Sequence, residues 1–128
     1  MSVIEKISEA ELVVLKVLWS KNEAISSAYI SEVISKETGW DKSTIRTLVH
    51  RLTEKGALIQ EKREMYYYFP TITEKEYVEA QTRSFLTKMY RGNAKKLVAS
   101  LFEQDYIQPD EIDELKQFWK KGENENVE

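Results

Sequence analysis

The chain has 128 residues, which suffices for one domain or for one small domain with an appendage. It contains no cysteine, which excludes a disulfide framework and thiolate metal sites, and no apolar run approaches the roughly 18 residues of a membrane span. The net charge of −3 is unevenly spread: residues 41–63 hold six Lys or Arg and three Asp or Glu, whereas residues 103–128 hold three and nine. DNA binding therefore stays open, because the local field rather than the total charge attracts DNA.

Two short helices are predicted in the first 40 residues. Ser8-Glu9-Ala10-Glu11 is a capping box, in which the Ser8 hydroxyl and the Glu11 carboxylate each satisfy a free amide at a helix start. The helix that it opens runs to about Ser20, with Trp19 expected in the core. A short strand is expected at residues 24–26, followed by a second helix that ends near Glu37, before the Gly39 break.

The next predicted helix carries the features of a DNA recognition helix. Asp41 is a good N-cap, and Gly56 is typical of the position just past a helix end. Ile45, Leu48, Val49 and Leu52 recur at the spacing of one apolar stripe. The polar face carries Lys42, Ser43, Thr44, Arg46, Thr47, His50, Arg51 and Lys55. Hydroxyls and Arg can bond base edges or phosphates in a major groove, although a solvated face of an ordinary helix is the alternative.

A β-hairpin is predicted directly after this helix. Residues 58–62 and 65–69 are strand-like in composition, and residues 62–64 are expected to form the turn. A hairpin that follows a helix-turn-helix is a wing, and its tip carries Lys62 and Arg63 as candidate phosphate contacts. The aromatic residues 66–69 either pack one face on the helices, which we favour, or form a base-stacking platform.

Three further helices are predicted in the C-terminal part. A second capping box at residues 73–76 opens a helix to about Arg91, another spans residues 94–103, and Pro109 starts the last. Three helices of this size cannot bury their apolar stripes alone, so we expect a second copy of the chain to cover them, with packing back on the wing domain as the alternative. The expected dimerisation residues are Phe85, Met89, Leu97, Val98, Leu101, Phe102, Ile112, Leu115 and Trp119.

These patterns predict a mainly α fold with a small β-hairpin wing. Residues 1–72 form a winged helix-turn-helix domain, residues 73–121 a helical dimerisation region, and residues 122–128 a disordered acidic tail. No enzyme is expected, because His50 is the only histidine and no phosphate loop or metal-spaced cluster is present, so neither metal nor cofactor is predicted. The first six residues lack the pattern of a signal peptide, and we expect a cytoplasmic protein without membrane insertion. A winged-helix module that binds proteins instead of DNA is the competing class.

Several segments resemble one known family of repressors. Residues 44–48 with Arg51-Leu52 and Lys55-Gly56 resemble the recognition helix of the penicillinase repressor family, the BlaI/MecI-type winged-helix repressors. Residues 7–11 resemble its first helix, residues 67–69 its second wing strand, and residues 90–92, 97–98 and 111–115 its dimerisation region. The resemblance covers roughly residues 4 to 120 in the same order.

This resemblance implies a homodimeric repressor on a palindromic operator, in a regulon of the β-lactam-resistance type. It also implies a membrane-linked sensor or protease pathway that ends repression by cutting the C-terminal region. The family's cut lies between an Asn and a Phe, whereas here Leu101 precedes Phe102, so that Ser100 and Leu101 are the candidate cleavage positions. The alternative is another signal, such as a metal or cell-wall stress. The copper-responsive branch binds metal through C-terminal cysteines, which this chain lacks.

Overall fold

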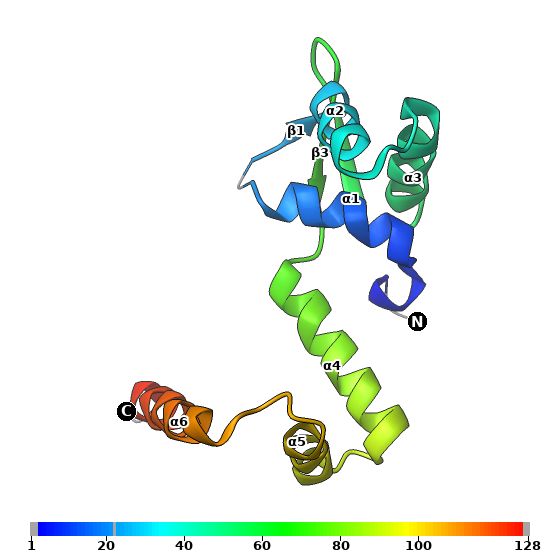
Figure 1. Cartoon of the computed structure of the whole chain (residues 1–128). Coiled ribbons are helices and arrows are strands. Elements are labelled where there is room, and N and C mark those ends of the chain that lie inside the picture. The colour runs from blue at the N-terminus through cyan, green and yellow to red at the C-terminus, as the bar shows by residue number, and fades with distance from the viewer. Residues whose placement is uncertain (1–2, 22, 127–128) are drawn as a thin grey trace. The chain divides into compact units, whose positions relative to one another are not determined.

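The computed structural model describes residues 3–21 and 23–126 (Figure 1). Its elements in chain order, with η for a 3₁₀ helix, are η1 (Ile4–Lys6), α1 (Glu9–Trp19), β1 (Ile25–Ser26), α2 (Ser27–Thr38), α3 (Lys42–Glu54), β2 (Leu58–Lys62), β3 (Tyr66–Pro70), α4 (Glu74–Tyr90), α5 (Ala94–Glu103), η2 (Pro109–Glu111) and α6 (Ile112–Asn126). Helices dominate and the strands form one small sheet, so the expected fold class is confirmed. Within the described ranges, no helix combines the length and the apolar character that a membrane crossing requires.

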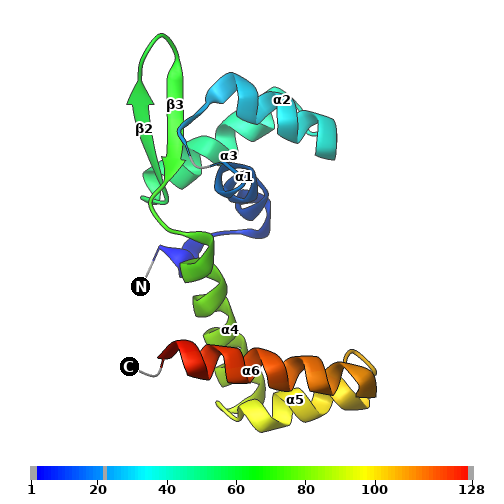
Figure 2. The same cartoon turned by 90° about the vertical axis from the view of Figure 1, so that its left-hand side faces the viewer.

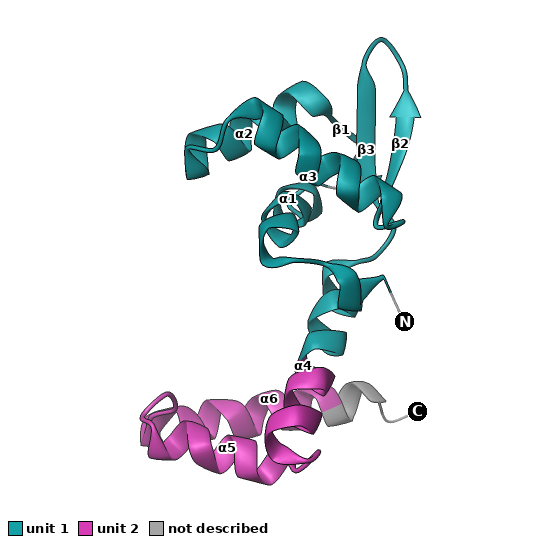
Figure 3. Cartoon of the chain, turned by 90° about the vertical axis from the view of Figure 1, so that its right-hand side faces the viewer, with its two compact units in different colours: residues 1–81 teal, residues 82–128 magenta. Residues whose placement is uncertain are grey.

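The chain divides into two compact units, residues 1–81 and 82–128 (Figure 3). The division falls inside α4, later than the boundary between residues 72 and 73 that the sequence suggested. The first turns of α4 belong to the N-terminal unit, and Trp19 of that unit contacts the chain there. Its indole Nε1 donates a hydrogen bond to the Ile72 carbonyl oxygen at 2.9 Å, and its ring centroid lies 5.6 Å from that of Tyr77.

The N-terminal unit combines α1, α2 and α3 with an antiparallel sheet in the order β1-β3-β2. Strands β2 and β3 form the hairpin (Figure 2), in which Lys62 lies opposite Tyr66. The short strand expected at residues 24–26 exists as β1, which pairs Ile25 with Tyr68. A helix-turn-helix followed by this hairpin is the winged-helix arrangement.

The core of this unit fixes which face of α3 points outward. All four residues of the predicted α3 stripe are buried, with Ile45 and Leu52 fully so. They pack with apolar residues of the other elements, namely Val14, Leu15, Val17, Leu18, Ile25, Ile30, Ile34, Ala57, Leu58 and Tyr68. Because α3 is anchored along one side only, its remaining side chains project into solvent.

The first two helices begin and end at the residues that the sequence indicated. The Ser8 hydroxyl accepts from the Glu11 N–H at 3.1 Å, and the Glu11 carboxylate accepts from the Ser8 N–H at 2.8 Å, which completes the capping box. The Ser26 hydroxyl caps α2 by accepting from the Tyr29 N–H at 3.2 Å. Gly39 ends α2 with φ +79°, in the left-handed region, and so permits the tight turn into α3.

Several boundaries differ from those predicted. The hairpin turn comprises residues 63–65 rather than 62–64, because Lys62 still pairs across the ladder and the Arg63 N–H donates to the Met65 carbonyl at 2.9 Å. Pro109 begins the 3₁₀ helix η2 rather than α6 itself.

The sequence predicts a disordered tail from Gly122 onward, whereas the structure assigns the backbone of residues 122–126 to α6; residues 127–128 lie outside the described residues. That prediction rested on polar composition. Glu123 and Glu125 are good helix formers, however, and a helical Gly costs only about 1 kcal/mol relative to Ala.

Candidate nucleic-acid interface

The solvent face of α3 gathers most of the DNA-binding candidates on one rigid element. Residues exposed there are Lys42, Ser43, Thr44, Arg46, Thr47, His50 and Arg51. The helix begins at Asp41, whose Oδ1 accepts from the Thr44 N–H and from the Ser43 hydroxyl, each at 2.8 Å. The Thr44 N–H, with the Ser43 hydroxyl in second place, holds the pKa of the Asp41 carboxyl below its ordinary value. The cap is therefore ionised at neutral pH and fixes the first turn.

The hydroxyl groups of this face are already partly engaged. The Ser43 hydroxyl donates to Asp41, and the Thr47 hydroxyl donates to the Ser43 carbonyl oxygen at 2.9 Å. Because both hydroxyl protons are used inside the helix, the two hydroxyl oxygens can only accept hydrogen bonds from a ligand. Acceptors suit the amino groups of adenine or cytosine.

The single histidine lies on the same stripe as these hydroxyls. Residues 43, 47, 50 and 54 follow one another at helical spacing on the side away from the core. The His50 Nε2 lies 3.3 Å from a Glu54 carboxylate oxygen, and both side chains are exposed. This is a surface pair of neighbouring turns, and Glu54 places an acidic group at the C-terminal end of the face.

A shallow depression of about 500 Å³ lies between α2, α3 and β3. It is lined by Ser27, Ala28, Ser31, Glu32, Lys42, Arg46, Tyr66 and Tyr68. The hydroxyls, Lys42 and Arg46 around this concave surface suit a phosphate contact, whereas the Glu32 carboxylate opposes one. The contribution of α2 was missed in the sequence, where only the one-turn spacing of Ser27 and Ser31 indicates it.

The wing holds its two basic side chains differently. The Lys62 Nζ lies 6.0 Å from the centroid of the Tyr66 ring. The Arg63 guanidinium instead pairs with Glu61, with contacts of 3.3 Å from Nε and 3.2 Å from Nη2, and its Cζ lies 4.6 Å from the centroid of the Tyr67 ring. The sequence offers Lys62 and Arg63 as equivalent candidates, but the Arg63 side chain is paired with a carboxylate and the Lys62 side chain lies near an aromatic ring.

The aromatic run of β3 is divided between core and surface. Tyr68 is buried, and its hydroxyl accepts from the Gln60 Nε2 at 2.8 Å, so this ring packs on the helices as we favoured. Tyr66 remains 42% exposed at the edge of the depression.

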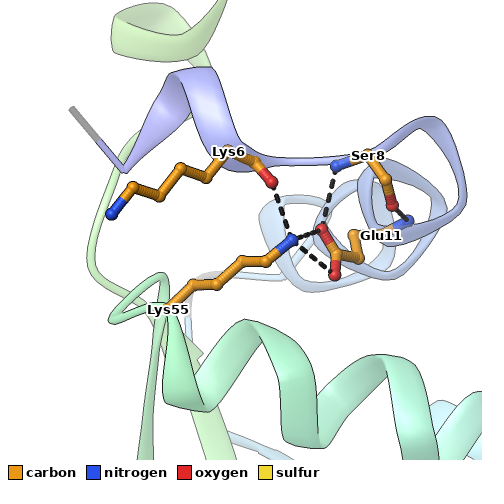
Figure 4. A network of polar contacts seen from close by, with 4 residues as sticks. All are labelled: Lys6, Ser8, Glu11 and Lys55. Atoms are coloured by element: carbon orange, nitrogen blue, oxygen red, sulfur yellow. Dashed lines mark hydrogen bonds and ion pairs between the residues drawn. The ribbon is translucent and has the colours of Figure 1, made fainter. Parts of the chain in front are cut away.

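Lys55, counted with the outward basic face in the sequence, turns away from it (Figure 4). Its Nζ donates to both carboxylate oxygens of Glu11, at 2.6 and 2.9 Å, and to the Lys6 carbonyl oxygen at 2.7 Å. Burial raises the pKa of Glu11, but hydrogen bonds from Lys55 and the Ser8 N–H, together with the Lys55 charge, outweigh it and lower the pKa. The ion pair therefore fastens the end of α3 to the start of α1.

The expected dimerisation residues lie on helices that bury little. No side chain among residues 82–122 is buried. Five of the nine are exposed, namely Phe85 (49%), Met89 (65%), Val98 (44%), Leu115 (49%) and Trp119 (72%). The other four, Leu97, Leu101, Phe102 and Ile112, are half-buried. Apolar surface of this extent, on helices without a core of their own, is typical of an interface.

The candidate cleavage positions lie within α5. Ser100 and Leu101 are half-buried and helical. The Ser100 hydroxyl oxygen accepts from the Tyr90 hydroxyl at 3.1 Å and from the Gln104 Nε2 at 2.9 Å. Over the described part of the chain, no three His, Cys, Asp or Glu side chains are grouped as metal ligands would be.

A sequence model described as "Penicillinase repressor" matches residues 7–121. The chain belongs to the penicillinase repressor family. It is similar to the penicillinase repressor of Bacillus licheniformis, with 36% identity over 129 aligned positions that cover 100% of both chains. It is also 32% identical to the methicillin resistance regulatory protein MecI of Mammaliicoccus sciuri, over 91% of this chain and 94% of that one. The resemblance found in the sequence is thereby confirmed.

Two solved structures of the penicillinase repressor BlaI share the fold of the N-terminal unit. The solution structure of its DNA-binding domain matches with a TM-score of 0.54 and 38% identity, over 60% of this chain and 94% of that chain. The B. licheniformis BlaI monomeric form in complex with the blaP half-operator matches with a TM-score of 0.50 and 39% identity, over 56% and 87%.

Proposed function

We propose that the chain is a transcriptional repressor that binds a palindromic operator as a homodimer. The observation that carries this proposal is the exposed face of α3, which presents hydroxyls, Lys and Arg from a helix anchored by its other side. The half-operator complex of the related BlaI supports it, because that protein shares 39% of the aligned residues. The protein would act on DNA in the cytoplasm, and no catalytic role is proposed.

The roles of single residues follow from their positions on α3. Thr44, Arg46 and Thr47 are assigned to base edges, and Arg46 in particular can make two bonds to guanine. Lys42, Ser43 and Arg51 are assigned to phosphates, with Lys42 beside the depression next to α2. On the wing, Lys62 is the phosphate contact, whereas Arg63 is held by Glu61.

Dimerisation through the C-terminal helices brings a second N-terminal unit, and with it the second half of the DNA-binding surface. The exposed side chains of Met89, Leu115, Phe118 and Trp119 gain most from burial against a second copy. Two linked N-terminal units then engage two half-sites at once. The second contact becomes effectively intramolecular, so the pair binds far more tightly than either unit alone.

We further propose a regulon of the kind after which the relatives are named, penicillinase and methicillin resistance. A cut at Ser100 or Leu101 would separate the dimerisation helices and release the operator. Because both residues are helical, α5 must unwind locally before a protease can bind the segment in extended form. Mass spectrometry of the chain from cells treated with a β-lactam tests this, and an intact chain whose repression has ended would indicate another signal, such as a metal or cell-wall stress.

The decisive experiment is a salt-dependent binding titration with the promoter DNA upstream of the chain's own gene. We expect binding at least about a thousandfold tighter than to unrelated DNA of equal length. Arg46→Ala should lose about 1–3 kcal/mol at one operator position and relax its sequence preference, whereas Lys42→Ala should weaken all sequences alike. Equal binding of operator and unrelated DNA would instead favour a protein-interaction module.

A further inference from the structure

The hairpin β2–β3 sorts its charged side chains onto two faces. Successive residues of a strand lie on opposite faces, so Glu61 and Lys62 of β2 lie on different sides of the hairpin, and the Arg63 side chain from the turn pairs with Glu61. Glu61 is the direct cross-strand partner of Tyr67. The Arg63 side chain therefore folds back from the turn over the pair formed by Glu61 and Tyr67, instead of extending beyond the tip of the wing.

Both contacts occupy the part of Arg63 that would bind DNA. The guanidinium uses Nε and Nη2 toward the two carboxylate oxygens of Glu61, at 3.3 and 3.2 Å, and its Cζ lies 4.6 Å from the centroid of the Tyr67 ring. A phosphate binds arginine through a similar pair of parallel N–H groups. A DNA phosphate and the Glu61 carboxylate thus compete for one edge of one side chain.

We propose that Glu61 withholds Arg63 from the DNA backbone and so limits the sequence-independent affinity of the wing. This inference rests on the proposed function, because it needs DNA beside the hairpin. Glu61 and Arg63 are half-exposed, with 48% and 51% of their side chains accessible. An exposed ion pair of this kind is weak, so removing the Glu61 charge should release Arg63 without disturbing the fold. Lys62 has no acidic partner in the described part of the chain and stays available.

The test compares Glu61→Gln with Glu64→Gln in the full chain. Both substitutions remove one negative charge from the wing, but only Glu61 contacts Arg63 in the described structure. We expect Glu61→Gln to bind operator and unrelated DNA about two- to fivefold more tightly at low salt, the range of a surface ion pair. The plot of log affinity against log salt should steepen by about 0.9, which corresponds to one more phosphate contact. Glu64→Gln should leave that slope unchanged.

A double-mutant cycle with Arg63→Ala isolates the pair. In the wild-type background Arg63→Ala should change DNA affinity by less than about twofold, since the side chain is already occupied, and in the Glu61→Gln background it should abolish the gain. Equal effects of the two Gln substitutions, or a severalfold loss from Arg63→Ala alone, would overturn the inference while operator recognition stands. A wild-type chain that fails to prefer its operator would overturn the proposed function as well. Thermal melting should be the same for all variants.

Discussion

Replacing Lys55 by methionine measures what its ion pair with Glu11 contributes to stability. Methionine keeps the length of the side chain but removes the cation. Glu11, 1% exposed, then loses two of its three hydrogen bonds and keeps only that from the Ser8 N–H. Removing one partner of a buried ion pair costs about 3–5 kcal/mol.

The geometry reduces this figure. The remaining Ser8 bond and the 29% exposure of the Lys55 side chain both soften the loss, so we expect about 2–3 kcal/mol. For a unit of this size that lowers the melting temperature by roughly 10–20 °C. Urea titration followed by circular dichroism measures the free energy of unfolding at pH 7, with Lys36→Met as the control, because it removes the same charge from an exposed site on α2.

The dependence on pH gives a second readout with a definite sign. The pKa of Glu11 in the folded chain lies below its ordinary value of 4.5, so the pair stabilises fully above that pH and loses this contribution as the pH falls through the folded pKa. The difference between wild type and Lys55→Met should therefore be largest at neutral pH and shrink below about pH 4.5. A difference near zero at pH 7, or one matched by Lys36→Met, would refute the reasoning.

Three other substitutions probe separate parts of the chain. Trp19→Phe removes the hydrogen bond to the Ile72 carbonyl and should cost about 1 kcal/mol in urea unfolding; unchanged stability would mean that water replaces the indole N–H. Gly56→Ala should lower the free energy of unfolding by about 1–2 kcal/mol through backbone strain at φ +86°. The new Cβ adds no clash, because its nearest neighbour is the Val3 side chain at 3.9 Å. Phe118→Glu should shift the chain from dimer to monomer in sedimentation, and a dimer that persists would place Phe118 outside the interface.

Local and periodic signals determined most of the fold and of the candidate interface. The Ser8 and Asp41 caps depend on residues three positions apart, and the buried stripe of α3 depends on helical spacing alone. The hairpin was equally visible, since two runs of β-forming residue types flank a short turn. With the inward stripe of α3 known, the outward face, including Arg46, followed directly.

Only the tertiary structure decided the pairings of individual side chains. Lys55 and Glu11 lie 44 residues apart, so no local pattern shows that this lysine turns inward rather than toward DNA. Trp19 likewise contacts Tyr77 of α4, far along the chain, and the unit boundary lies inside that helix. Arg63 is close to Glu61 in sequence, yet which acid it meets depends on its rotamer over a cross-strand ring. Residue spacing determines on which face of a helix or strand a side chain lies, whereas tertiary packing determines which other side chain it contacts.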